Sequence, residues 1–120
     1  AVLELHLARP ELQFLRLHHI PAWRCNSGAT KIGGRFIRFG AVGMADILAV
    51  RSVTQHVTST GSVLADLAKP IGQLVCIEVK SASGRLTAPQ AAFLEAVTKA
   101  GGKAFCARSV DDVRRELGLA

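Results

Sequence analysis

The segment from Leu74 to Lys80 constrains the fold more than any other part of the chain, because its side chains alternate as they do along a strand. One face of this predicted strand carries Val75, Ile77 and Val79, and the other carries Cys76, Glu78 and Lys80. After it, Thr87 is typical of a helix cap, so we expect a helix from Ala88 that Gly101 ends. A second strand follows from Lys103 to Ala107. A strand-helix-strand unit of this length permits a parallel crossover, which predicts an α/β fold with a mixed β-sheet flanked by helices.

The N-terminal part of the chain has a helical pattern. Leu12, Leu15 and His19 share one helical face, and Pro10 suits a first helical turn, so the pattern predicts a helix from about 10 to 19. Whether this helix extends back over residues 2–8 is left open, because a proline inside a helix removes a hydrogen bond and usually kinks it.

Glycines and alternating residues predict the elements between these two regions. Turn residues from 26 to 34, followed by the alternating segment Arg35–Phe39, indicate a hairpin, and the apolar run Ala45–Val50 indicates a buried strand. Residues 52–70 give no clear assignment. At the C-terminal end, Ser109 is expected to cap a short helix that Gly118 ends. The predicted order is helix, three strands, helix, strand, helix.

The charge of the chain points toward a polyanionic partner. Its 120 residues are expected to form one domain, and 15 basic against nine acidic residues give a net charge of +6. No acidic residue occurs between Leu12 and Ala45. Such a stretch can follow a phosphate backbone, although a solvated basic face is an equally good interpretation from charge alone. The basic residues of this stretch are Arg16, Arg24, Lys31, Arg35 and Arg38.

The cysteines and the apolar content bear on location and assembly. Three cysteines, Cys25, Cys76 and Cys106, are odd in number and too far apart for a zinc knuckle, which favours a reducing cytoplasmic setting. No apolar run approaches the roughly 20 residues that span a bilayer, and no signal pattern opens the chain, so no membrane partner is expected. An apolar content of 49% is high for a small soluble monomer and predicts a subunit interface.

Three ionisable residues in apolar surroundings are the candidate chemistry: Asp46, Glu78 and Lys80. Glu78 and Lys80 project from one strand face about 6–7 Å apart. If Asp46 lies on the neighbouring strand, two carboxylates converge beside an ammonium, which suits Mg²⁺ or Mn²⁺ and phosphodiester hydrolysis by a bound water. The alternative is an ordinary exposed ion pair on an edge strand, worth under about 1 kcal/mol, with Asp46 as a turn residue.

The motifs around these residues resemble the virus-type replication-repair nuclease (VRR-NUC) family, a branch of the PD-(D/E)XK nuclease superfamily. The resemblance covers nearly the whole chain and implies a restriction-endonuclease-like core. It implies that Asp46, Glu78 and the carbonyl of Val79 bind metal, that Lys80 serves the water, and that Gln90 reaches the site. It also implies homodimers that act on branched DNA. The matching segments are Trp23–Gly28, Gly34–Gly40, Gly40–Asp46, Ile77–Lys80, Gly84–Leu86 and Gln90.

Several assignments remain open at the level of sequence. Members of this family have a glutamate on the first helix facing the site, and either Glu4 or Glu11 could fill that role. Gln90 also completes a capping box with Thr87, so it has a structural role that does not require catalysis. Arg85 joins Arg24, Lys31, Arg35 and Arg38 as a candidate nucleic-acid contact. The four histidines are assigned to the surface or to packing. The single tryptophan could stack on a base, although a core position is more common for such a residue.

The expected function is therefore a Mg²⁺- or Mn²⁺-dependent DNA endonuclease that is selective for Holliday junctions or flaps in replication or repair. Two rivals remain. One is a non-catalytic module that binds branched nucleic acid on the same fold. The other is an RNA-processing nuclease, because phosphodiester chemistry at a metal does not by itself distinguish the sugar.

Overall fold

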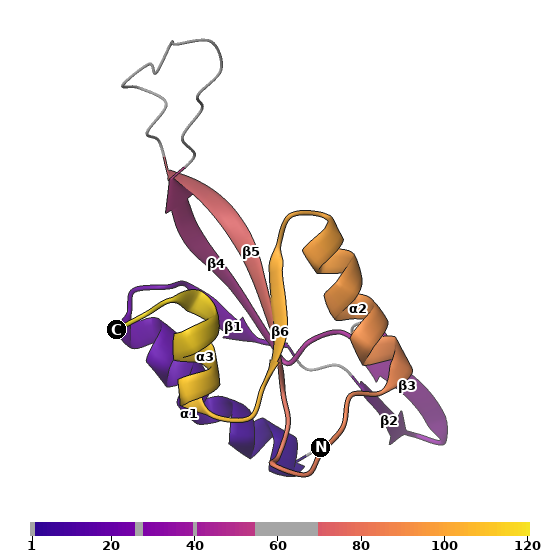
Figure 1. The fold of residues 1–120 in the computed structure, drawn as a ribbon. Helices are drawn as coiled ribbons and strands as arrows, with labels where there is room; N and C mark the ends of the chain where they lie inside the picture. The colour runs from indigo at the N-terminus through magenta and orange to yellow at the C-terminus, as the bar shows by residue number, and fades with distance from the viewer. Residues whose placement is uncertain (1, 26–27, 40, 55–69) are drawn as a thin grey trace.

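The computed structural model describes residues 2–25, 28–39, 41–54 and 70–120, and for residues 2–8, 28–32 and 36–39 it describes the backbone alone. Within these residues the chain forms a small α/β fold with a four-stranded mixed sheet, a separate two-stranded sheet and three helices (Figure 1). None of the described helices is long and apolar enough to cross a membrane. The elements are α1 (Val2–Leu17), β1 (Ala22–Arg24), β2 (Gly28–Ile32), β3 (Arg35–Phe39), β4 (Ile47–Thr54), β5 (Pro70–Val79), α2 (Ala88–Lys99), β6 (Lys103–Ala107) and α3 (Val110–Leu117).

The main sheet has the strand order β1-β4-β5-β6. The strands β1 and β4 pair antiparallel, as do β4 and β5, whereas β5 and β6 pair parallel through the connection that contains α2. The predicted mixed sheet with a strand-helix-strand unit is therefore confirmed. β5 is a central strand, because β4 and β6 form backbone hydrogen bonds with it on either side.

Helices cover the two faces of the sheet differently. α1 and α3 lie together on one side of the sheet and α2 lies on the other (Figure 1). The α1/α3 side holds the larger apolar cluster, which includes Leu15, Ile47, Ile77 and Val113, all fully buried. The α2 side holds a smaller cluster around Leu94 of α2. The core therefore sits between α1, α3 and the sheet.

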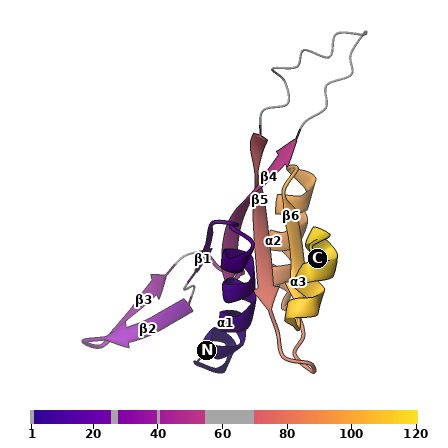
Figure 2. The same ribbon diagram turned by 90° about the vertical axis from the view of Figure 1, so that its left-hand side faces the viewer.

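The β2–β3 hairpin stands away from the main sheet, as Figure 2 shows. It is inserted between β1 and β4, which are hydrogen-bonded neighbours in the sheet. Gly33 and Gly34 have positive φ angles of 57° and 80° in its turn, a conformation that glycine adopts without steric cost. The predicted hairpin is confirmed in β3 and in its turn at Gly33 and Gly34, whereas residues 28–32, which were predicted as part of the turn, form β2.

The structure corrects several predicted boundaries. α1 begins at Val2 and ends at Leu17, so Pro10 lies inside the helix and not in its first turn. This is tolerated because proline's fixed φ is itself helical and only one backbone hydrogen bond is lost. β5 begins at Pro70, four residues before the predicted start. The strands β1 and β2 were not predicted, because β1 has only three residues and Gly28, where β2 begins, indicated a turn. Of the unassigned segment, residues 55–69 lie outside the described residues.

The two C-terminal helices match their predictions closely. Thr87 caps α2 in a full capping box with Gln90, and Ser109 caps α3 by accepting a hydrogen bond from the backbone N–H of Asp112. Gly118 ends α3 in the left-handed conformation. These ends were predictable because capping depends on residues adjacent in sequence.

Candidate active site

Asp46 and Glu78 lie opposite each other on neighbouring strands. Ile47 pairs with Ile77 in the antiparallel register, so the next row of the sheet pairs Asp46, which directly precedes β4, with Glu78 of β5. The Oδ2 atom of Asp46 accepts a hydrogen bond of 2.8 Å from the backbone N–H of Val79, which fixes this carboxylate against β5. Because residues opposite each other in a sheet share a face, both carboxylates lie on the α2 side.

This row continues across the whole sheet. Glu78 pairs with Cys106 of β6, and the backbone N–H of Cys25, just after β1, donates to the carbonyl of Asp46 at 2.6 Å. The row therefore reads Cys25, Asp46, Glu78 and Cys106 from one sheet edge to the other. Two acidic side chains stand at its centre, with a thiol on each flank.

The loop before Asp46 packs closely on the start of α2. Gly43 has a φ of +80°, and a Cβ placed on it would lie 2.5 Å from the backbone carbonyl of Pro89. Such a contact is impossible without movement of one backbone or the other, and the positive φ disfavours other residues in any case. Gly43 thus allows the approach that brings Asp46 beside the first turn of α2, where Gln90 lies.

Glu78 and Lys80 form a buried pair and not the exposed edge-strand pair of the alternative interpretation. The exposed fractions of these residues are 1% for Glu78 and 7% for Lys80. The Nζ atom of Lys80 lies 3.6 Å from Oε1 of Glu78. A buried carboxylate and ammonium carry a desolvation cost that an exposed pair does not, so this arrangement is one that a simple stabilising role explains poorly.

Gln90 makes the contacts of both interpretations that the sequence left open, because it caps α2 and also reaches Glu78, while a catalytic role stays a prediction. Its Oε1 accepts from the backbone N–H of Thr87 at 2.9 Å, and the hydroxyl of Thr87 accepts from the backbone N–H of Gln90 at 3.3 Å, which completes the capping box. Its Nε2 donates to Oε1 of Glu78 at 3.0 Å. One amide therefore ties the N-terminus of α2 to the buried carboxylate and fixes that carboxylate's orientation.

The thiols beside the carboxylates are protonated at neutral pH. Burial, together with the smaller effect of Cys25, raises the pKa of Cys76 to about 11. Burial also raises the pKa of Cys25, where the charge of Asp46 acts in the same direction, and burial raises that of Cys106 despite the nearby Arg108. Neutral thiols are weak nucleophiles and poor metal ligands.

The first-helix glutamates differ in what the structure describes. Glu11 is buried with 4% exposed, one turn before Phe14 and Leu15 on the α1 surface that packs on the sheet. Burial raises its pKa, and its Oε2 has no hydrogen-bond partner among the described residues. The side chain of Glu4 lies outside the described part. Because α1 covers the opposite face from Glu78, a role for Glu11 beside Asp46 and Glu78 remains a prediction.

The carboxylate oxygens of Asp46 and Glu78 are the candidate ligands for a divalent cation. Among the described residues, no group of three or more His, Cys, Asp or Glu side chains could hold a metal ion. Asp46 and Glu78 form a pair of hard oxygen donors on one row, and Mg²⁺ is usually bound through one or two carboxylates with water filling the other positions. The two carboxylates therefore fit Mg²⁺ or Mn²⁺.

The predicted nucleic-acid contacts occupy different places. Arg35 is exposed at the start of β3 and Arg85 is exposed in the loop after Lys80. Arg24 is half-buried and lies in the row of Ile47, whose side chain belongs to the α1 face, so it faces away from the carboxylates. Lys31 and Arg38 belong to the β2–β3 hairpin, and their side chains are outside the described part.

Two features of the region were missed by sequence reasoning. Arg108 is exposed directly after β6 and donates to the carbonyl of Ser81, next to Lys80. Its position just past a strand end was the only signal for it. Trp23 is 56% exposed, so the core position that the sequence favoured is wrong. The reason is that β1 is an edge strand, and α2 packs on β5 and β6 instead. The histidine assignments hold where they are described, since His18 packs on the ring of Phe14 and His19 is exposed.

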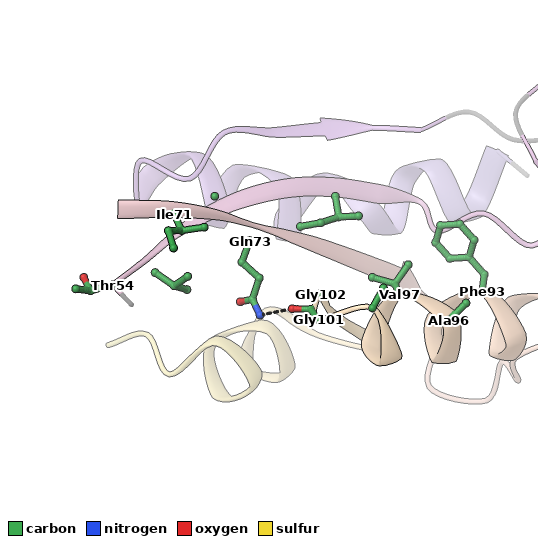
Figure 3. Close-up of a pocket in the computed structure, with 12 residues that line it drawn as sticks. Thr54, Ile71, Gln73, Phe93, Ala96, Val97, Gly101 and Gly102 are labelled. Atoms are coloured by element: carbon green, nitrogen blue, oxygen red, sulfur yellow. Dashed lines mark hydrogen bonds between the residues drawn. The ribbon is translucent and has the colours of Figure 1, made fainter. Parts of the chain in front are cut away.

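A separate apolar groove lies away from the carboxylate row. It has a volume of about 840 Å³ and is bordered by the far ends of β4 and β5 and by the C-terminal half of α2 (Figure 3). Gln73 crosses it and donates to the carbonyl of Gly101 at 2.9 Å. None of its lining residues belongs to the Asp46–Glu78 row, so its size does not make it the site of the proposed chemistry.

Comparisons of the chain with family models, with curated proteins and with solved structures gave no match. What this region could do chemically follows from its own residues. It presents two carboxylates, an ammonium and an orienting amide on one face of a central strand pair.

Proposed function

We propose that the chain is a metal-dependent nuclease with a PD-(D/E)XK-type core of the VRR-NUC kind, formed by residues 1–120 as a single domain. One observation carries the proposal: Asp46 and Glu78 are opposite each other on adjacent strands, and Lys80 lies 3.6 Å from Glu78. Two carboxylates with a neighbouring lysine are the set that hydrolysis of a phosphodiester at Mg²⁺ or Mn²⁺ requires.

In this proposal Asp46 and Glu78 hold the cation, and the backbone carbonyl of Val79 is a further donor. A bound cation neutralises developing charge on the phosphate and lowers the pKa of a coordinated water. Lys80 donates a hydrogen bond to the attacking water and balances the negative charge of the site. Gln90 keeps Glu78 in a single orientation through its 3.0 Å hydrogen bond. Glu11 or Glu4 is proposed as an additional acid.

The proposed substrate is DNA, in particular branched DNA such as a four-way junction or a flap. The net charge of +6 and the acid-free stretch from Leu12 to Ala45 support a polyanionic partner. Arg24, Lys31, Arg35, Arg38 and Arg85 are the proposed phosphate contacts. Three free cysteines agree with action in the cytoplasm. Exposed Val50 and Leu74, which pair across β4 and β5, support the proposed homodimer, because large apolar side chains exposed close together favour a protein contact.

The test is cleavage of labelled four-way junction, flap and linear duplex DNA in Mn²⁺, Mg²⁺ or EDTA. Wild type and Lys99→Ala should cut in either metal and not in EDTA, because Lys99 is an exposed lysine in a surface pair with Glu95. Lys80→Ala should lose cutting by at least about 100-fold, as expected when a group acting on the transition state is removed.

Three other results would contradict this proposal, and the first two would each favour a rival function. Tight junction binding with no cutting in any divalent cation would favour the non-catalytic binding module. Cutting of the matching RNA with no cutting of DNA would favour the RNA-processing nuclease. Equal cutting by wild type and Lys80→Ala would remove Lys80 from the mechanism.

A further inference from the structure

Trp23 is a large aromatic side chain left open at the edge of the main sheet. It is 56% exposed on β1, and it is the only tryptophan in a chain that has no tyrosine. Full burial of a tryptophan is strongly favourable, so an exposed one on a regular strand calls for a physical explanation.

The register puts Trp23 two rows from the carboxylates, which is the nearest row on the same sheet face. Trp23 pairs with Leu48, which pairs with Cys76, and the next row on the same face contains Asp46 and Glu78. Alternate residues of a strand are about 7 Å apart and share a face. The indole therefore rises from the same sheet face as Asp46, close enough for a nucleotide adjoining a phosphate at Asp46 and Glu78 to reach it.

The helix α2, which covers this face of the sheet, does not extend over Trp23. α2 contacts β5 and β6, and its buried Leu94 packs with Cys76. Ala22, the residue before Trp23, is buried on the opposite face against the α1 cluster. The strand alternation thus directs Ala22 into the core and Trp23 outward on the α2 side, where no described helix covers β1.

The charge around Trp23 favours nucleic acid over a second copy of the chain. In sequence, Trp23 lies inside the acid-free stretch from Leu12 to Ala45 and shortly before the hairpin on which Arg35 is exposed, while the neighbouring Arg24 faces the α1 side. The centre of a protein–protein interface is usually depleted of charge. An aromatic ring within a basic stretch is instead the combination that binds single-stranded nucleic acid, by stacking bases and attracting the backbone.

We propose that Trp23 is a stacking platform for an unpaired nucleobase next to the phosphate at the Asp46–Glu78 row. The substrate class is then nucleic acid with at least one unpaired nucleotide beside the cleavage point, such as a flap or an open junction, and not continuous duplex. The inference rests on the proposed function for its placement, but stacking itself requires no cutting.

Because the chain has one tryptophan and no tyrosine, its intrinsic tryptophan fluorescence reports on Trp23 alone. Wild-type protein in EDTA, where no cutting is expected, would be titrated with a single-stranded oligonucleotide, a flap and a blunt duplex while tryptophan fluorescence is recorded. We expect quenching by the single strand and the flap, and much less by the duplex. Affinities of variants without tryptophan would come from the anisotropy of labelled DNA.

The matched variants are Trp23→Phe, which keeps an aromatic ring, and Trp23→Leu, which keeps apolar bulk without one. Trp23→Leu should weaken flap binding by about 5- to 150-fold, as stacking of about 1–3 kcal/mol per base requires, and Trp23→Phe by less. Binding of the blunt duplex should change little in either variant.

Unchanged flap affinity in Trp23→Leu would overturn the inference, as would equal weakening for flap and blunt duplex. Fluorescence that changes with protein concentration in the absence of DNA, together with a dimer lost in Trp23→Leu, would assign Trp23 to a second copy instead. If wild type never cuts with any divalent cation but Trp23 is quenched selectively by unpaired DNA, the nuclease proposal fails and the stacking platform stands.

Discussion

The two faces of β5 differ in the side chains that they bury. On β5, Val75, Ile77 and Val79 pack with α1 and α3 in the larger apolar cluster. The alternate residues Cys76 and Glu78, followed by Lys80, face the α2 side, where the apolar cluster is small and two charged groups are buried.

The difference teaches where stability and chemistry reside in this fold. Burial of apolar side chains stabilises the α1/α3 face, by about 1.5–3 kcal/mol for each large one. The α2 face buries Glu78 and Lys80 beside Asp46, which opposes folding unless the charges are compensated. A fold that needed only stability would have apolar residues on both faces. Substitutions on the α1/α3 face should therefore lower stability and leave activity per folded molecule unchanged, whereas removing both buried charges from the α2 face should abolish activity without lowering stability.

The largest stability effect is expected from removing one member of the buried pair. Lys80→Met leaves Glu78 buried beside the half-buried Asp46 without the ammonium and should lower the free energy of unfolding by about 3–5 kcal/mol in EDTA. Urea denaturation measures it.

The double variant Glu78→Gln with Lys80→Met is the control. It removes both charges, keeps similar volumes and should restore stability to the wild-type value or above while cutting stays absent. A double variant less stable than Lys80→Met would show that the pair stabilises the fold and would weaken the contrast between the faces.

On the other face, Ile77→Ala should lower the free energy of unfolding by about 2–5 kcal/mol, because it leaves a cavity in the α1/α3 cluster. Cleavage per folded molecule should change little, since the side chain points away from the carboxylate row. Chemical denaturation and cleavage at a temperature where the variant is folded measure the two quantities. A loss of cutting larger than the loss of folded protein would contradict the separation of the faces.

A smaller effect should separate the two roles of Gln90. Thr87→Ala removes one side of the capping box and should cost about 1 kcal/mol of stability with cutting preserved. Gln90→Ala should have a similar stability cost but also lower the cleavage rate, because Glu78 loses its orienting hydrogen bond. Equal activity in the two variants, measured as single-turnover cleavage, would reduce Gln90 to a capping residue.

The smallest effect concerns Glu11 and depends on pH. Burial raises the pKa of Glu11 above the ordinary value of 4.5, so the folded state binds this proton more tightly than the unfolded state. The protein should therefore lose stability as pH rises from 4.5 through the raised pKa, and Glu11→Gln should be more stable than wild type at neutral pH. This gain should shrink as pH falls toward 4.5.

Thermal unfolding between pH 4 and pH 8 in EDTA measures this effect. If Glu11 joins the metal site, the gain should fall when Mn²⁺ is added. A gain that is independent of both pH and metal would show that neither the titration of Glu11 nor its proposed role is correct.

The parts of the fold that the sequence predicted are those set by neighbouring residues. The face alternation of β5 and the caps of α2 and α3 follow from local patterns, and the structure confirms them. The boundaries of α1 and the existence of β1 depend on packing with distant strands. Local signals at Pro10 therefore left the start of α1 open, and those around Trp23 indicated no strand and favoured a core position that the structure contradicts.

The candidate site divides in the same way. The same-face arrangement of Glu78 and Lys80 was readable from their spacing of two residues. The pairing of Asp46 with Glu78 was a conditional expectation, because strand register is a long-range property. Arg108 and the flanking thiols could not be foreseen, since they reach the site only through the strand order β1-β4-β5-β6.

The most direct test of the central claim is calorimetric titration of Mn²⁺ into the metal-free protein, with wild type compared with Asp46→Asn and Glu78→Gln. Both variants keep the size of the natural residue and one acceptor oxygen, and they replace the other, charge-bearing oxygen with an uncharged NH2 group. The account predicts saturable Mn²⁺ binding in wild type and at least a tenfold loss of affinity in each variant. Wild-type affinity in both variants, or no binding in wild type, would contradict the assignment of this row as the metal site.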